Sequence, residues 1–199
     1  MLHDRSTCPV MRLLVDRTRR ASVAGPALAQ AHREVGAALA PFAGQRCSLE
    51  PVPIDHVAGP SQGVELGQGE APIVLVLMRA GLFVAEGIWS CLHGAALLPW
   101  DGQPGALLAA PIEGRPVIVV DSVINTGRSI NQTMELLGDL QPRWISVAAL
   151  VANSAGLNSC LSRWPEVDFA IARVSSRSYV GRGSTDTGAR LFGTTGWET

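Results

Sequence analysis

From Pro72 onward the chain contains four short apolar segments, and these constrain the fold more than any other feature of the sequence. Each is about as long as a β-strand, and helical patterns at Ser129–Leu140 and Ser154–Trp164 separate the last three. Strands that are apolar on both faces and alternate with helices indicate a parallel sheet that is covered on both sides. We therefore expect an α/β fold with a central parallel sheet. The predicted strands are Ile73–Met78, Val117–Val120, Ile145–Val151 and Val167–Ala172.

The segment before these strands is predicted to hold one long helix and one loop. From Pro26 to Phe42 apolar residues recur at spacings of three and four, which is typical of an amphipathic helix, and Pro26 suits its first turn. The stretch from Gly44 to Gly69 is rich in glycine and proline. We expect it to form a loop with at most one edge strand.

Length and composition indicate one domain, spanning residues 1–199, and exclude several kinds of chemistry. Of the 199 residues, 47% are hydrophobic and 17% are charged, which is typical of a compact globular domain. The formal net charge of -1 gives no electrostatic signature of a nucleic-acid binder. All 16 basic residues are arginine, so the chain has neither a Schiff-base lysine nor the lysine of a Walker-type phosphate loop. Any bound anion must meet arginine, hydroxyls, backbone amides or a metal.

The cysteines and the N-terminus favour a cytoplasmic protein. Cys8, Cys47, Cys91 and Cys160 form no CxxC pair, so we expect reduced thiols rather than disulfides or a zinc site. The N-terminal segment is too polar for a secretory signal, and no apolar run approaches the roughly 18 residues of a membrane span. We expect no membrane partner.

The segment from Asp121 to Ser129 has the pattern of a phosphate site. It follows a buried strand and passes through hydroxyl residues and Gly127 into a helix, whose first turn offers free backbone N–H groups and the positive end of the helix dipole. Thr126 and Ser129 add hydroxyl donors, and Asp121 stands at a strand end where α/β sheets bind ligands. A capped helix beside a solvated Asp would show the same local pattern.

Two further segments are candidates for binding. Arg79 follows the strand that begins at Ile73, and a guanidinium there can grip a diphosphate with two hydrogen bonds, although a strand-end Arg is more often a surface residue. The run from Tyr179 to Thr194 is rich in glycine and hydroxyl residues, and it suits either a base-binding loop or a flexible tail.

Together these segments resemble the uracil phosphoribosyltransferase family, in the same order and at the same relative positions. The family's LRAG-type, DPMLATGGS-like and YIVPGLGDAGDRLFGT-like motifs correspond to MRAG at Met78–Gly81, DSVINTGRS at Asp121–Ser129 and YVGRGSTDTGARLFGT at Tyr179–Thr194. The resemblance extends loosely from about Leu13 onward. It implies a type I phosphoribosyltransferase fold, in which a small hood from the C-terminal segment covers the active site.

The resemblance also implies the role of each site residue in transferring phosphoribose from phosphoribosyl pyrophosphate (PRPP) to a pyrimidine base. Asp121 would bind the ribose hydroxyls, Arg79 the pyrophosphate and Asn125–Ser129 the 5′-phosphate, while Asp186 would lie beside base and ribose. The Arg79–Ala80 peptide bond would be cis. Asp121, Arg79 and Asp186 are the predicted catalytic residues. The implied PRPP-binding residues are Arg79, Asp121, Ser122, Val123, Ile124, Asn125, Thr126, Gly127, Arg128, Ser129 and Asp186; those for the base are Val180, Thr185, Asp186 and Thr187.

The implied cofactor is Mg²⁺, which we expect to be held through substrate oxygens and water rather than by direct protein ligands. Family members associate, so we expect a homodimer. The substrates would be PRPP and a pyrimidine base, with uracil yielding UMP in pyrimidine salvage.

Departures from the family pattern leave alternatives open. Family members close an arginine- and lysine-bearing hairpin over the diphosphate, whereas Ala96–Arg115 is shorter and lacks the corresponding cations. The chain is therefore either an active transferase or a homologue that binds PRPP or a nucleotide as a sensor. The sequence at Gly59–Gly63 also fits the GxSxG motif of hydrolases, but no buried strand precedes Ser61 and no helical pattern follows it.

Overall fold

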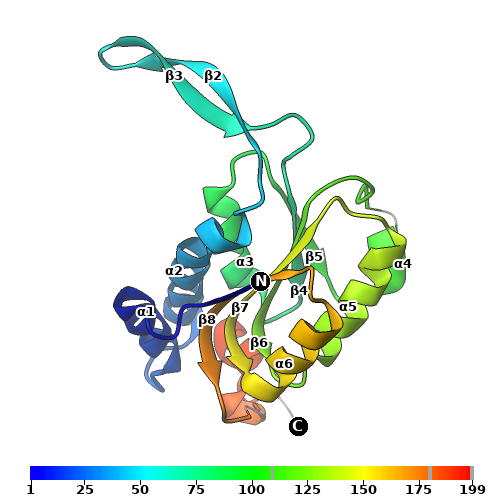
Figure 1. Ribbon diagram of the computed structural model, residues 1–199. Helices are drawn as coiled ribbons and strands as arrows, with labels where there is room; N and C mark the ends of the chain where they lie inside the picture. Colours follow the sequence, from blue (N-terminus) through cyan, green and yellow to red (C-terminus); the bar gives the residue numbers. More distant parts are fainter. Residues whose placement is uncertain (109, 179–180, 198–199) are drawn as a thin grey trace.

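The computed structural model describes residues 1–108, 110–178 and 181–197 of the chain (Figure 1). Its centre is a sheet of six strands in the order β1-β8-β7-β6-β4-β5, and every neighbouring pair is parallel. The expected α/β class is thus confirmed, and each predicted strand is present. The strands are β1 (Leu2–Asp4), β4 (Ile73–Leu77), β5 (Ala96–Trp100), β6 (Val117–Ile124), β7 (Ile145–Asn153) and β8 (Asp168–Ser175).

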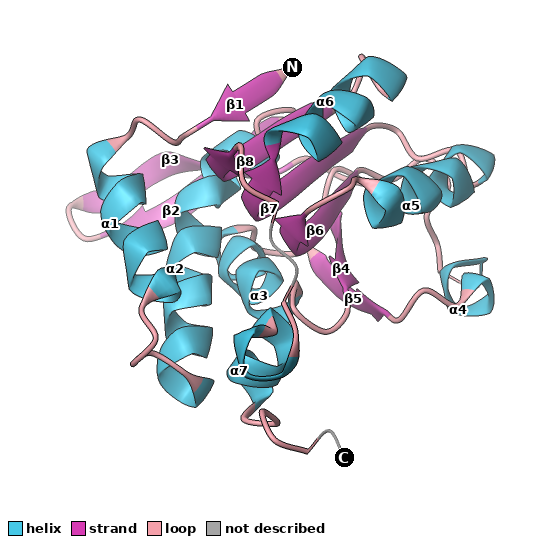
Figure 2. Cartoon of the chain, turned by 90° about the horizontal axis from the view of Figure 1, so that it is seen from below, coloured by secondary structure: helices cyan, strands magenta, loops and turns pink. Residues whose placement is uncertain are grey.

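Helices cover both faces of this sheet (Figure 2). One face packs against α5 and α6 through Ile130, Met134 and Leu157, and the other packs against α1, α2 and α3 through Val15, Leu39 and other apolar residues. None of the helices in the described ranges is long and apolar enough to cross a membrane. The helices are α1 (Pro9–Arg19), α2 (Gly25–Ala43), α3 (Leu82–Cys91), α4 (Pro104–Leu108), α5 (Arg128–Asp139), α6 (Ser154–Arg163), α7 (Thr187–Phe192) and the 3-10 turn η1 (Gly183–Thr185).

The strand order creates a switch point between β4 and β6. From β4 the chain continues outward to β5, whereas from β6 it runs in the opposite direction to β7 and β8. At such a point the connections leave the carboxyl ends of the two strands in opposite directions and open a crevice, which is where α/β sheets bind ligands. Arg79 follows β4 and Asp121 lies in the C-terminal half of β6, so the topology brings the two predicted residues together.

The prediction of a loop from Gly44 to Gly69 is wrong. The segment forms an antiparallel hairpin, β2 (Leu49–His56) and β3 (Gly59–Leu66), which projects from the body of the protein (Figure 1). Its prolines argued against strands, but in a two-stranded ribbon each strand keeps a free edge where the missing N–H of proline costs nothing. Ser61 pairs with Ile54 in this exposed ribbon, far from the strand-to-helix turn that a hydrolase nucleophile needs.

The core predicts a matched pair of substitutions. Leu39 in α2 is completely buried, whereas Leu13 in α1 is 74% exposed. Leu39→Ala should lower the free energy of unfolding by about 2–5 kcal/mol, because it leaves a cavity against the sheet. Urea denaturation measures this loss, and Leu13→Ala should change the value by less than about 1 kcal/mol. Equal losses in the two variants would contradict the described packing of α2.

Candidate functional site

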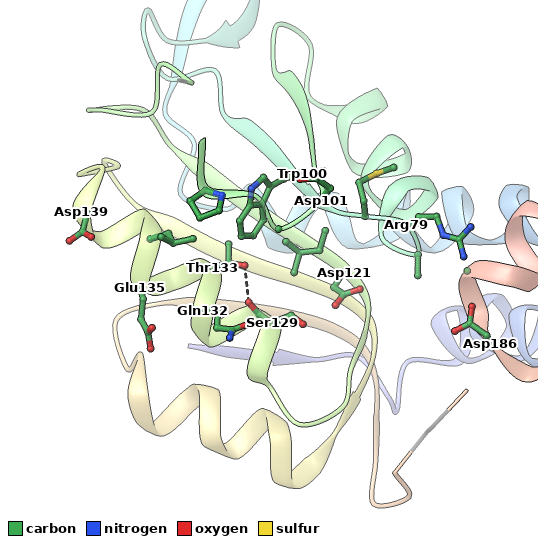
Figure 3. Close-up of a pocket in the computed structure, with 17 residues that line it drawn as sticks. Arg79, Trp100, Asp101, Asp121, Ser129, Gln132, Thr133, Glu135, Asp139 and Asp186 are labelled. Carbon is green, nitrogen blue, oxygen red and sulfur yellow. Dashed lines mark hydrogen bonds between the residues drawn. The ribbon is translucent and has the colours of Figure 1, made fainter. Parts of the chain in front are cut away.

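A cavity of about 820 Å³ opens at the switch point. Four of the residues singled out in the sequence line it together, namely Arg79 after β4, Asp121 in β6, Ser129 in α5 and Asp186 at the start of α7 (Figure 3). They come from three separate segments of the chain, since Asp121 and Ser129 belong to one segment, and the fold brings them to one cavity. The volume is in the range of small-molecule and cofactor sites.

Asp121 is the most strongly perturbed acid of the site. Burial raises the pKa of its carboxyl from 3.8 to about 6, although the backbone N–H groups of Ser122 and Val123 oppose the shift by donating to Oδ1 at 2.6 and 3.4 Å. The strand continues to Ile124, so Asp121 lies within β6 rather than at its end as predicted. The turn before α3 packs directly on it, since a Cβ at Gly81 would lie 2.7 Å from the Val120 carbonyl oxygen and 3.2 Å from Asp121 Cα.

Arg79 and Asp186 approach each other at Gly188. A Cβ added at Gly188 would lie 3.2 Å from Asp186 Oδ1 and 3.7 Å from Arg79 Nη2, so both side chains border the same glycine. Asp186 Oδ1 also accepts a hydrogen bond from the N–H of Ala189 at 2.7 Å, which caps α7 and fixes the carboxylate. Figure 3 shows Arg79 and Asp186 on one side of the pocket, next to Asp121. A guanidinium and two carboxylates thus meet there.

The expected cis peptide bond lies one residue earlier than predicted. The bond between Met78 and Arg79 is cis, rather than that between Arg79 and Ala80. The turn starts directly after β4, which ends at Leu77.

The phosphate-type loop between β6 and α5 depends on Gly127. This residue adopts φ +78°, in the left-handed region, and a Cβ there would lie 2.7 Å from Cys160 Sγ and 2.9 Å from the Gly156 carbonyl oxygen. Only glycine fits both conditions. The Thr126 hydroxyl accepts from the N–H of Arg128 at 3.3 Å, and the Arg128 side chain is exposed.

Some of the predicted binding residues line two neighbouring cavities, and others among the described residues line neither. Ser129 lines the 820 Å³ cavity, whereas Ile124, Asn125, Thr126, Gly127 and Arg128 do not. Ser122, Val123 and Thr187 line a neighbouring cavity of about 670 Å³. Thr185 is exposed in η1, where its hydroxyl accepts from the N–H of Arg182 at 3.0 Å. Val180 lies outside the described residues.

The sequence reasoning missed one wall of the cavity. Gln132, Glu135 and Asp139 of α5 line it at spacings of three and four, which place them on one side of the helix. The spacing of these three polar residues in the sequence could have indicated this wall of the cavity. Trp100 and Asp101 form another part of the wall; the indole of Trp100 is buried and donates to the Gln103 carbonyl oxygen at 2.7 Å. This part of the predicted lid therefore contributes a carboxylate and an aromatic ring.

A buried histidine of α2, His32, contacts β6 next to Asp121. His32 Nδ1 lies 2.9 Å from the Leu28 carbonyl oxygen, which can only accept, so Nδ1 carries the proton and Nε2 accepts from the Ser122 hydroxyl at 3.3 Å. Burial lowers the pKa of His32 from 6.5 to about 4, so the ring is uncharged at neutral pH. No sequence motif singled out this residue, because its partner lies 90 positions away.

Comparison with known proteins finds a matching family model and structures with the same fold. The family model described as uracil phosphoribosyltransferase matches residues 6–194. The AQ2163 protein from Aquifex aeolicus aligns with 98% of this chain and 100% of its own at 19% identity, with a TM-score of 0.80. The TT1426 protein from Thermus thermophilus aligns with 83% of this chain and 98% of its own, also at 19% identity, with a TM-score of 0.54. These two structures share the fold.

The raised pKa of Asp121 predicts a pH-dependent gain in stability on Asp121→Asn. Between pH 3.8 and about 6 the folded state binds a proton that the unfolded state has lost, so the charged carboxylate destabilises the fold above that range. At pH 8 the variant should be more stable by about 1–3 kcal/mol, and the gain should vanish as the pH falls toward 4. Thermal unfolding across this range measures it.

Asp55→Asn is the control for this test, because Asp55 is exposed in the hairpin. Its stability should track that of the wild type at every pH. An Asp121→Asn variant that is less stable than the wild type at pH 8 would show that the carboxylate is not under the burial penalty described.

Proposed function

The chain belongs to the uracil phosphoribosyltransferase family, and on that premise we propose that it transfers the phosphoribosyl group of PRPP to a pyrimidine base, with uracil giving UMP and pyrophosphate. The observation that carries the proposal is the meeting of Arg79, Asp121 and Asp186 in one cavity at the switch point of the sheet. A carboxylate suits ribose hydroxyls, and a guanidinium suits a diphosphate. Phosphoribosyl transfer needs both groups near one anomeric carbon.

The proposed reaction makes one bond and breaks one. The lone pair of a ring nitrogen of the base forms a bond to the anomeric carbon of PRPP, and the bond from that carbon to the pyrophosphate oxygen breaks. The bonding pair leaves with pyrophosphate, and the proton of the ring nitrogen passes to water or to the product phosphates. Arg79 stabilises the charge that grows on the leaving group, and Asp121 holds the ribose while its ring becomes electron-poor.

The acidic side chains of the cavity fit a hydrated magnesium ion. Asp121 and Asp186 face the same space as Asp101, while no group of three His, Cys, Asp or Glu side chains in the described residues is arranged to hold a metal alone. Mg²⁺ binds phosphate oxygens and keeps several waters, and it would supply neutralisation of the pyrophosphate charge. Asp121 and Asp186 would accept hydrogen bonds from those waters.

A second candidate function is binding of PRPP or a nucleotide without turnover. The segment that follows β5 favours this second function. Its Asp101 lines the 820 Å³ cavity, and Ala96–Gly114 contains no cation that could close over a diphosphate. Tight binding of PRPP in calorimetry, with no release of pyrophosphate in the presence of any base, would identify this function.

We also propose that the protein acts as a homodimer in the cytoplasm. The projecting β2–β3 hairpin supports this, because Leu49, Val57 and Val64 lie exposed on it and a second copy of the chain would cover them. Light scattering coupled to size-exclusion chromatography should give twice the mass of the chain. A monomer at micromolar concentration would contradict the dimer.

Pyrophosphate release tests the activity and the role of Arg79 together. Wild-type protein with PRPP, magnesium and uracil should release pyrophosphate in a base-dependent manner. Arg79→Gln should raise KM for PRPP at least tenfold, roughly 1.4 kcal/mol or more of lost binding, because the diphosphate loses its bidentate partner. Arg12→Gln removes an exposed arginine of α1 and should leave KM unchanged. Equal KM values for the two variants would contradict the assignment.

A further inference from the structure

The 670 Å³ cavity adjoins the 820 Å³ cavity at the switch point, and two elements, β6 and α7, contribute residues to both. In β6, Asp121 lines the first cavity, and Ser122 and Val123 line the second. In α7, Gly188 lines the first and Thr187 the second. Ser178, immediately before the predicted base-binding segment, also lines the second. A base that reacts at an anomeric carbon held beside Asp121 must sit next to that carbon, and the second cavity is the adjoining space.

Strands β6 and β7 contribute to the floor of this second cavity through Ser122, Val123, Leu150 and Val151. The three strands β6, β7 and β8 keep one continuous register here, in which Val123, Val151 and Arg173 form a row across the sheet. Strand spacing places Arg173 two strands, or roughly 10 Å, from Val123. A long arginine side chain can reach back across much of that distance.

The wall of the 670 Å³ cavity next to β8 is positively charged. Arg19 of α1, Arg173 of β8 and Arg177 after β8 all line the cavity, and burial together with these two neighbouring arginines lowers the pKa of Arg173, an effect that Asp16 partly opposes. Asp16 forms an ion pair with Arg19 at 2.6 Å on the surface. No carboxylate belongs to the described residues that line the cavity.

The remaining polar groups of the cavity do not neutralise this charge. The Arg190 guanidinium donates to the Arg20 and Val23 carbonyl oxygens at 2.9 and 2.7 Å, and His32 is uncharged. Among the ion pairs of the described residues, none includes Arg173 or Arg177. The cavity therefore combines a cationic wall with an apolar floor. The floor consists of Val15, Leu28, Val123, Leu150 and Val151.

We propose that the second cavity receives the base and that Arg173 and Arg177 bind a carboxylate on it, so that the preferred substrate is a carboxylated pyrimidine rather than unsubstituted uracil. The apolar floor suits a flat ring, and two arginines free of ion-pair partners in the described structure suit a carboxylate. This inference rests on the proposed phosphoribosyl transfer and narrows its substrate class.

Competing bases test the preference. The value of kcat/KM should be at least tenfold higher for uracil-6-carboxylate or uracil-5-carboxylate than for uracil. Arg173→Gln should lower that ratio at least tenfold, mainly through KM for the carboxylated base. Arg12→Gln is the matched control, because Arg12 lies on α1 and lines a smaller neighbouring cavity but not this one, and the ratio should not change. Preference for uracil, or a ratio that Arg173→Gln does not alter, would overturn the inference.

Binding of product nucleotides separates this inference from the proposed activity. Orotidine 5′-monophosphate and UMP differ only by the carboxylate, and calorimetry with each needs no turnover. We expect the carboxylated nucleotide to bind at least tenfold more tightly than UMP to the wild type, and this difference to shrink in the Arg173→Gln variant and to vanish when Arg177 is also replaced by Gln. If no base supports pyrophosphate release but this difference persists, the activity fails and the carboxylate site stands. If UMP binds as tightly as its carboxylated analogue, the carboxylate site fails.

Discussion

The buried carboxylate of Asp121 is the constraint on which the rest of the site depends. It lies within a strand of the parallel sheet, on the wall of the cavity, where burial makes an ionised group costly, and the backbone N–H groups of Ser122 and Val123 offset only part of that cost. The neighbouring elements fit closely around it: Gly81 lets the turn before α3 pack against β6, and the uncharged His32 accepts a hydrogen bond from the hydroxyl of the next residue, Ser122. A charge kept at such a cost is typical of a functional group rather than a structural one.

The C-terminal segment depends on α2 for its position over the site. Leu191 packs on Leu28 and Ala29, and Arg190 donates to two carbonyl oxygens of the α1–α2 connection. Asp186 caps α7 and faces Arg79 at the same time. Because α2 also packs on the sheet and on α3, the two carboxylates and the guanidinium are held by a continuous set of contacts. The segment thus forms the hood that the sequence predicted, in the part that the structure describes.

Local patterns predicted the α/β sheet, and they also predicted which segments border the crevice, whereas the roles of the site residues stay predictions. Apolar runs identified four of the six strands of the sheet and missed the short strands β1 and β5. The turn chemistry of Asp121–Ser129 and the position of Arg79 indicated the two sides of the crevice. The β2–β3 hairpin was missed because Pro51 and Pro53 argue against strands in general, and their tolerance on the free edges of a ribbon is visible only once the pairing is known.

The division of the site into two cavities could not be predicted from the sequence either. It depends on the cross-strand register that aligns Val123 with Arg173, residues that are far apart in the chain. His32 escaped notice for the same reason, since only the packing of α2 on β6 brings it to Ser122.

Mass spectrometry of the reaction products tests the central claim most directly. Purified protein would be incubated with PRPP, magnesium and a mixture of uracil and its two monocarboxylates. The account predicts that a pyrimidine nucleoside 5′-monophosphate accumulates in step with pyrophosphate, and that Asp121→Asn reduces the yield by orders of magnitude. Absence of any nucleotide from the wild type, under conditions where PRPP binds, would contradict it.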